Sequence, residues 1–256
     1  MTIESILLES TATEIIVLGW LFFGGIYVSF AAFNRLLTRI IFPAIGFGGM
    51  LDPRPLASGQ LKREWLFSAG TVFLYGVGML APWGMLQLGW AHLAQDPGTG
   101  RIVVESLILF IWNEAHFYVN HRLLHTKWLM RFHLPHHRSI ITTPWSTYSL
   151  HPVEALMLGN VLLLPMLVHD FSAMALLSVP IFSLIVNNIG HSNYNFLPWA
   201  DKDRWWLNSS RRHHLHHACY HGNFGFMFPF MDRLFGTVLP ADAADGRFAE
   251  WQRKNT

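Results

Sequence analysis

Residues 102–137 read IVVESLILFIWNEAHFYVNHRLLHTKWLMRFHLPHH, an apolar run that passes directly into clusters of histidine. The apolar part, residues 102–119, is long enough to cross the hydrocarbon core of a membrane as a helix. The clusters that follow have the spacings His121-x-x-x-His125 and His133-x-x-His136-His137. Steps of three and four residues place side chains on one face of a helix, so these imidazoles can share a metal ion. The stretch therefore predicts a membrane helix that ends at a metal site.

The composition of the whole chain is that of a membrane protein. Of its 256 residues, 52% are hydrophobic and only 13% are charged, and the charged share is about half that of a soluble protein. Further apolar runs occupy residues 15–33, 65–95, 153–168 and 171–189. The run 65–95 is interrupted by Pro82, and the last two runs are short enough to form a tilted hairpin. We expect a single membrane-embedded domain over residues 1–256, all-α, with four or five transmembrane helices.

Basic residues are unevenly distributed around these runs, and this asymmetry predicts an orientation. They follow the first, third and fifth runs: Arg35, Arg39, Arg54, Lys62, Arg63, Arg122, Lys127, Arg131, Arg138, Lys202, Arg204, Arg211, Arg212 and Arg233. The other connecting segments, 91–101 and 169–172, carry only Arg101. Because basic loops stay on the cytoplasmic side of a membrane, we expect the main histidine clusters to face the cytoplasm. The formal net charge of only +2 does not suggest binding to nucleic acid.

Nine histidines fall into spaced sets. The set His213-x-x-His216-His217 repeats the spacing of His133, His136 and His137 about eighty residues later, and His191 stands alone between them. Imidazole suits Fe, Zn, Cu or Ni, whereas Ca and Mg prefer oxygen ligands. A structural zinc ion needs four ligands. Nine histidines instead suit two ions with four or five ligands each. Because the H-E-x-x-H motif usual in zinc hydrolases is absent, a pair of redox irons that activates O₂ is the better fit.

Two other classes of protein are alternatives. A membrane protein that binds or transports a metal without redox chemistry could use the same histidines, although a transporter is expected to hold them at mid-membrane. A zinc-dependent membrane hydrolase would usually carry the motif H-E-x-x-H, which is absent here. Cys219 is the only cysteine, so the sequence does not favour a thiolate metal site.

Seven short segments between residues 110 and 240 occur in a distinctive order. They are NHRLLH (120–125), FHLPHHR (132–138), LHPVE (150–154), GHSNYNFLP (190–198), RHHLHH (212–217), NFG (223–225) and MDRLFGT (231–237). Together they resemble the motifs of the fatty acid hydroxylase / sterol desaturase superfamily of membrane di-iron oxygenases. The resemblance assigns residues 110–240 as the catalytic region.

The resemblance implies a bundle of membrane helices with a cytosolic helical cap that holds two iron ions. The implied ligands are His121, His125, His133, His136, His137, His191, His213, His216 and His217. No catalytic side chain beyond the metal ligands is expected. The implied reaction uses O₂ to hydroxylate or desaturate a lipid, such as a sterol or a fatty acyl chain, in lipid metabolism. Because no cytochrome-like segment is fused to this chain, we expect a separate electron donor, for example a ferredoxin, a cytochrome b5-like protein or a reductase.

Six more residues are candidates for weak ligands or for groups that orient the ligands: Asn195, His116, His151, Glu154, His214 and Asn223. Asn195 stands four residues after His191, where some members of the family have another ligand. His116 precedes the first cluster by little more than one helical turn. Residues that orient a ligand commonly accept a hydrogen bond from its second ring nitrogen, and this is the role we expect for most of the six.

Overall fold

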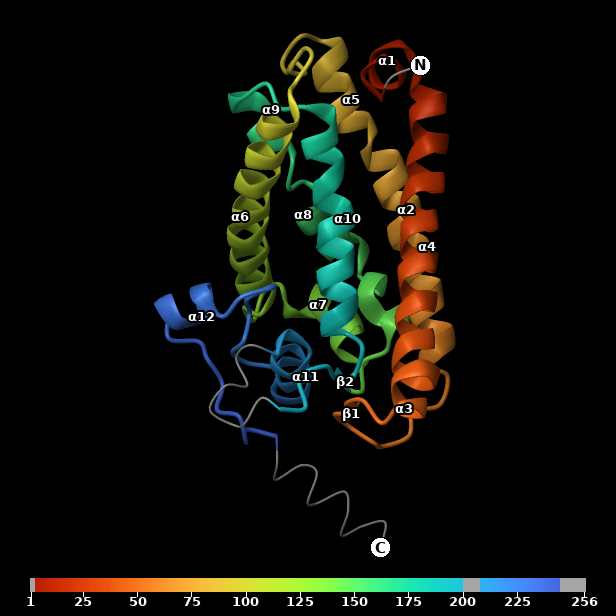
Figure 1. The fold of residues 1–256 in the computed structure, drawn as a ribbon, viewed down its shortest axis with the longest axis vertical. Coiled ribbons are helices and arrows are strands. Elements are labelled where there is room, and N and C mark those ends of the chain that lie inside the picture. Colours follow the sequence, from red (N-terminus) through yellow and green to blue (C-terminus); the bar gives the residue numbers. More distant parts are fainter. Residues whose placement is uncertain (1–2, 200–207, 245–256) are drawn as a thin grey trace, which may run out of the picture.

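The computed structural model describes residues 3–199 and 208–244, which form a mostly helical bundle (Figure 1). The helices are α1 (Ile3–Glu9), α2 (Ala12–Leu36), α3 (Phe42–Ala44), α4 (Gln60–Gly78), α5 (Leu80–Gln87), α6 (Thr99–Leu124), α7 (Met130–His137), α8 (Pro152–Gly159), α9 (Leu163–Val168), α10 (Ala173–Gly190), α11 (Ser209–Cys219) and α12 (Phe230–Leu234). A π-helical turn, Leu37–Ile41, joins α2 to α3, and a 3₁₀ helix, Pro144–Tyr148, precedes α8. Two short strands, β1 (Gly49–Met50) and β2 (Tyr194–Asn195), pair antiparallel.

Within these described residues, four helical segments are long and apolar enough to cross a membrane. They are Ala12–Ala44, Gln60–Gln87, Thr99–Leu124 and Ala173–Gly190. The expectation of a mostly helical chain is therefore confirmed, and the four candidate spans agree with the four or five membrane helices expected. The run with Pro82 forms one nearly continuous passage through α4 and α5, whereas the fourth run forms the two short helices α8 and α9.

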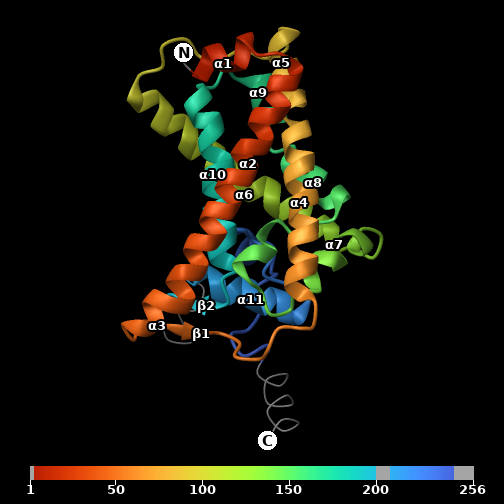
Figure 2. The ribbon, with the colours of Figure 1, turned by 90° about the vertical axis from the view of Figure 1, so that its right-hand side faces the viewer.

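The long helices run side by side along the bundle (Figures 1 and 2). Helices α2, α6 and α10 all run towards the end that carries α7, α11 and the two strands, while α4–α5 and the broken passage α8–α9 run back. The turn between α9 and α10 is fixed by Glu105 on α6, whose carboxylate accepts a 2.7 Å hydrogen bond from the Ser172 backbone amide. Ser172 in turn caps α10 through the Ala175 amide.

Helices α2 and α4 cross at a point of backbone contact. A β-carbon on Gly19 would lie 2.8 Å from the Gly76 Cα, and one on Gly76 would lie 2.0 Å from the Trp20 ring. The Trp20 ring is held there because its Nε1 donates a 3.1 Å hydrogen bond to the Phe73 carbonyl. Small residues at a crossing let membrane helices approach closely, since packing rather than water drives their association.

The histidine-bearing end is tied together by the paired strands. Gly49 pairs with Asn195, and Met50 pairs with Tyr194. The Asn193 side chain accepts a hydrogen bond from the Asp52 amide and donates one to the Asp52 carbonyl, at 2.8 and 2.9 Å. These contacts join the connection between α3 and α4 to the segment that follows His191.

The connecting segments in which the sequence concentrates its basic residues lie at this same end of the bundle (Figure 1). Lys202 and Arg204 of that set lie outside the described residues. The cytoplasmic location of this end stays a prediction from the charge distribution.

Candidate metal centre

All nine histidines of the spaced sets meet at the end of the bundle, in two groups. The ligand atoms within each group lie within 4.8 Å of one another. The first group is His121, His125, His133, His137 and His216, and the second is His136, His191, His213 and His217. The division into five and four agrees with the number of ligands per ion expected from the sequence. That these residues bind metal stays a prediction.

Each H-x-x-H-H set contributes histidines to both groups. The set on α7 gives two histidines to the first group and one to the second, and the set on α11 does the opposite. On α7, His133 and His137 join the first group and His136 joins the second; on α11, His216 joins the first group while His213 and His217 join the second. Residues four apart share a helix face, whereas the residue three positions on lies to one side of it. Helix α6 then adds a pair to the first group, and α10 adds one residue to the second.

The second ring nitrogen of most group members is fixed by an acceptor from the protein. His121, His125 and His216 donate from Nδ1 to the backbone carbonyls of Phe224, Tyr220 and Gly222, at 2.8–3.1 Å. His191 donates in the same way to the Asn187 carbonyl, at 2.8 Å. His133 donates to the Glu154 carboxylate at 2.7 Å. A neutral imidazole that donates from Nδ1 presents a lone pair at Nε2.

These lone pairs converge. Seven pairs of Nε2 atoms within the groups lie 3.0–3.1 Å apart. Burial lowers the pKa of His125 and of His191 to about 4, and it lowers the pKa of His133, His136, His137, His213, His216 and His217 well below the usual value. Protons therefore do not charge these rings near neutral pH. Buried neutral imidazoles whose lone pairs point at a common centre fit a bound cation. Without a cation, these lone pairs would repel one another.

The loop between α11 and α12 supplies three of the accepting carbonyls, those of Tyr220, Gly222 and Phe224, and Asp232 on α12 holds this loop in place. The Asp232 carboxylate accepts 2.8 Å hydrogen bonds from the amides of Phe224 and Gly225 and a 2.7 Å bond from the Thr237 hydroxyl. Asn223 secures the same loop, since it accepts from the Leu239 amide and donates to the Arg212 carbonyl. Asn223 thus acts on the groups through the backbone.

The other candidate residues lie around the two groups. His151 caps α8, where its ring accepts from the Val153 amide at 3.1 Å. His116 Nε2 lies 2.8 Å from Asn160 Oδ1, so it pairs with the α8–α9 connection. His214 is buried, belongs to neither group, and lines a separate hollow beside β1. The Asn195 side-chain oxygen accepts from Asn208 and from the Leu197 amide, so it is engaged within the protein.

Sequence reasoning missed the carbonyl acceptors and the residues that position them. Asp232 belongs to the segment MDRLFGT, but the segment itself indicates no role for it, and nothing in the sequence distinguishes Tyr220 or Gly222. Backbone carbonyls have no side-chain signature, so only the left-handed backbone at Tyr220 (φ 65°) and Gly222 (φ 73°) marks this turn. Glu64 on α4 was also missed; it accepts hydrogen bonds from Ser139 and Thr143, directly after α7.

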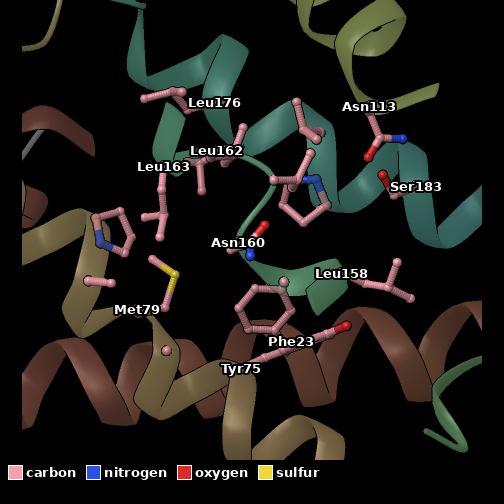
Figure 3. A pocket seen from close by; sticks show the side chains of 18 of the residues that line it. Phe23, Tyr75, Met79, Asn113, Leu158, Asn160, Leu162, Leu163, Leu176 and Ser183 are labelled. Carbon is pink, nitrogen blue, oxygen red and sulfur yellow. The ribbon is translucent and has the colours of Figure 1, made fainter. Parts of the chain in front are cut away.

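An apolar cavity of about 290 Å³ lies between the helices (Figure 3). Its lining includes Leu176 and Met79 towards the far end and Phe117 near the groups. The Phe117 ring contacts the His121 ring edge to face, with centroids 5.0 Å apart. Asn187, whose carbonyl accepts from His191, lines the cavity as well. The cavity is therefore lined by residues that contact both groups, Phe117 through its ring and Asn187 through its backbone carbonyl.

Comparison with known proteins gives consistent relatives. The family model for fatty acid hydroxylase matches residues 106–237, which overlap the region 110–240 assigned from the motifs. A Δ7-sterol 5(6)-desaturase of Eremothecium gossypii is 25% identical over 237 residues, which cover 88% of this chain and 62% of the relative. A very-long-chain aldehyde decarbonylase of Oryza sativa subsp. indica is 34% identical over 146 residues, which cover 53% of each chain.

A further Δ7-sterol 5(6)-desaturase, from Gibberella zeae, is 26% identical over 161 residues, which cover 59% of this chain and 44% of the relative. The chain thus spans about half the length of these curated relatives. No solved structure is detectably similar to it.

Proposed function

The chain belongs to the fatty acid hydroxylase family, and on that premise we propose that it is a membrane di-iron oxidoreductase that uses O₂ to hydroxylate or desaturate a lipid. The substrate would be a sterol, a fatty acyl chain or a related lipid of the bilayer. The observation that carries the proposal is the pair of buried imidazole groups at the end of an apolar cavity. The sterol desaturases and aldehyde decarbonylases among its relatives support lipid as the substrate class.

The number of imidazoles in the groups supports iron over a structural zinc ion. A structural zinc site is closed by four ligands. The two groups together bring nine imidazoles to one place, five in the first group and four in the second. Imidazole donors suit iron, and these two groups would hold one iron ion each.

Iron bound by these groups would supply, together with O₂, the oxidising power to remove hydrogen from an unactivated C–H bond. The residues of the chain do the rest. Carbonyls of Phe224, Tyr220 and Gly222 keep each donating ring in one tautomer and one orientation. The apolar cavity holds the lipid, and side chains such as Phe117 exclude water from the space beside His121. Electrons would come from a separate donor, such as a ferredoxin, a cytochrome b5-like protein or a reductase.

The geometry favours this function over a metal transporter and over a zinc hydrolase. A transporter would hold its ligands at mid-membrane on interrupted helices, but here the groups lie at one end of the bundle, on α7, α11 and the ends of α6 and α10. A hydrolase needs a carboxylate that can activate water. Glu154 is the carboxylate that contacts a group histidine, and that contact is a hydrogen bond with His133 Nδ1, on the side of the ring away from the group.

The test is metal content combined with oxygen uptake. The full chain is purified without oxygen in detergent, its metals are measured by mass spectrometry, and O₂ uptake is followed after a chemical reductant and a lipid extract are added. We expect close to two irons per chain and O₂ uptake that depends on both additions. One zinc per chain, or bound metal without O₂ uptake, would overturn the proposal. Lipid profiles of cells with and without the protein then identify the lipid that is consumed.

A further inference from the structure

Three side chains that line the apolar cavity carry a buried polar atom with no hydrogen-bond partner in the described part of the chain: Asn113, Ser183 and Trp83. Asn113 on α6 and Ser183 on α10 both line the cavity (Figure 3). Only 6% of Asn113 is exposed, and its amide nitrogen has no partner. The Ser183 hydroxyl is also buried without a partner. A buried polar group that is left unpaired destabilises the fold, so a ligand that pairs with it is favoured.

Other polar groups in this part of the bundle do form hydrogen bonds with one another. Ser178, five residues earlier on α10, donates to the Ala175 carbonyl at 2.7 Å and lies 3.2 Å from the Ser106 hydroxyl. His116 and Asn160, which also line the cavity, pair with each other. The Trp83 indole lacks a partner as well, but it lies on α5, whereas Asn113 and Ser183 lie on the packed helices α6 and α10. An oxygen atom of a ligand between these two side chains would satisfy both of them.

The two side chains lie at the same depth in the bundle. Helices α6 and α10 run in the same direction, and Phe110 on α6 stacks on Phe182 on α10 with ring centroids 4.0 Å apart. Asn113 precedes His121 by eight residues (121 − 113), and Ser183 precedes His191 by eight residues (191 − 183). A helix rises 1.5 Å per residue, so both side chains lie about 12 Å along the helix axes from a candidate metal ligand.

The charge of the lining indicates which oxygen would bind. Among the described residues that line the cavity there is no Asp, Glu, Lys or Arg. A carboxylate or phosphate buried there would have no counter-ion, and an unpaired buried charge costs far more than a buried neutral polar group. An amide and a hydroxyl can donate to, and accept from, a hydroxyl, and they can donate to a carbonyl. The matching ligand is a neutral lipid oxygen.

We propose that Asn113 and Ser183 bind the hydroxyl or carbonyl oxygen of a neutral lipid whose oxidised carbon lies about 12 Å from that oxygen. This inference rests on the proposed function, since it names the lipid class that the same cavity accepts. The site would bind an oxygenated neutral lipid in preference to a hydrocarbon or to an ionised fatty acid.

Matched probe lipids test the proposal by binding alone. The full chain in lipid nanodiscs is incubated with tritium-labelled octadecan-1-ol or octadecane, with cholesterol or cholestane, and with stearate. We expect at least one oxygenated probe to bind about tenfold more tightly than its hydrocarbon partner, as two ordinary hydrogen bonds would give. The pair that shows this preference tells whether the oxygen belongs to a linear or a fused-ring lipid. Equal binding within both pairs, or tighter binding of stearate than of octadecan-1-ol, would overturn the proposal.

Variants assign the preference to the two side chains. Ser183→Ala and Asn113→Leu should each bring the ratio of affinities close to one while the hydrocarbons bind as before. Ser178→Ala removes a hydroxyl that is already bonded and should keep the wild-type ratio. Retention of the ratio in Ser183→Ala, the smaller change, would contradict the assignment even if Asn113→Leu folded poorly. The binding ratio requires no turnover, so a chain that shows it but consumes no O₂ contradicts only the proposed function.

Discussion

At the scale of single residues, the group histidines divide their two ring nitrogens between the protein and the proposed ion. In His121, His125, His191 and His216 the Nδ1 atom donates to a backbone carbonyl. This donation fixes the tautomer, so the Nε2 lone pair is available without loss of a proton at neutral pH. Metal binding then needs little reorganisation of the protein.

Removal of one ligand should affect one group more than the other. His136→Ala deletes a member of the four-residue group and leaves the five-residue group complete. We expect the iron content to fall from about two to about one per chain and O₂ uptake to be lost, since paired ions act together. Metal analysis by mass spectrometry gives the stoichiometry. His221→Ala is the matched control, because His221 lies on the same segment as the α11 ligands and belongs to neither group. An unchanged iron content in His136→Ala would contradict the assignment.

Glu154 provides a test of ligand orientation. It is almost fully buried and accepts from His133 Nδ1 at 2.7 Å. We expect Glu154→Leu to weaken metal affinity by about 10–100-fold, as the loss of such partners commonly does, and Glu154→Gln to lose less because its amide oxygen still accepts. Competition with a chelator measures the affinity. If the Leu variant retained metal as well as the wild type, Glu154 would have no orienting role.

The candidate ligands could be predicted from the sequence, whereas the groups that accept hydrogen bonds from them could not. Spacings of three and four residues single out His133, His136 and His137 without any knowledge of the fold. The carbonyls of Gly222 and Phe224 could not be found in this way, since any residue has a carbonyl and only the tertiary fold aims it at a ring. The partner of His133, Glu154, was recognised only as a candidate through a motif.

At the scale of elements, helix geometry explains why the two groups differ in size. Helix α6 ends at Leu124, and the amide of its C-cap residue His125 still donates to the His121 carbonyl, so these two histidines, four residues apart, join the same group. Helix α10 ends at Gly190, and Asn193 has a left-handed backbone (φ 50°) before β2 begins. Residue 195 therefore does not follow His191 by a helical step, and Asn195 bonds with Asn208 instead. The spacing alone predicted that two H-x-x-H-H elements would share the metal ions. It could not assign each histidine to one group, because that depends on which neighbouring helix each side of the element faces.

The crossing of α2 and α4 makes a measurable contribution to stability. A β-carbon on Gly76 would lie 2.0 Å from the Trp20 ring, and the Trp20 hydrogen bond to Phe73 prevents the ring from moving freely. We expect Gly76→Ala to lower the free energy of unfolding by about 1–3 kcal/mol through overpacking. Gly70→Ala, on the same helix and with nothing within 4 Å of the added carbon, should be neutral or slightly stabilising. Unfolding in mixed detergent micelles compares the two, and equal stabilities would show that the helices adjust without cost.

At the scale of the whole molecule, the broken passage α8–α9 gives the bundle its cavity. Four helical segments of the described chain reach spanning length, but Pro152–Val168 is shorter and is interrupted at Asn160. Residues at this break, among them Asn160 and Leu162, line the cavity (Figure 3). The count of four or five membrane helices stayed open in the sequence because an apolar run of this length suits a tilted helix and a broken one equally well. Only packing against α4 and α6 distinguishes them.

The orientation of the bundle is the remaining whole-molecule prediction, and the single cysteine makes it testable. In a Cys219→Ala background, Lys127→Cys places a thiol on the exposed segment beside the histidine groups, and Asp96→Cys places one on the exposed connection at the other end. Because basic segments stay in the cytoplasm, we expect a membrane-impermeant maleimide to label residue 96 on intact cells and residue 127 only after the membrane is opened. The reverse pattern would put the histidine groups outside the cytoplasm. Reductants of the cytoplasm could then not reach them, and the proposed electron supply would be wrong even if the metal assignment held.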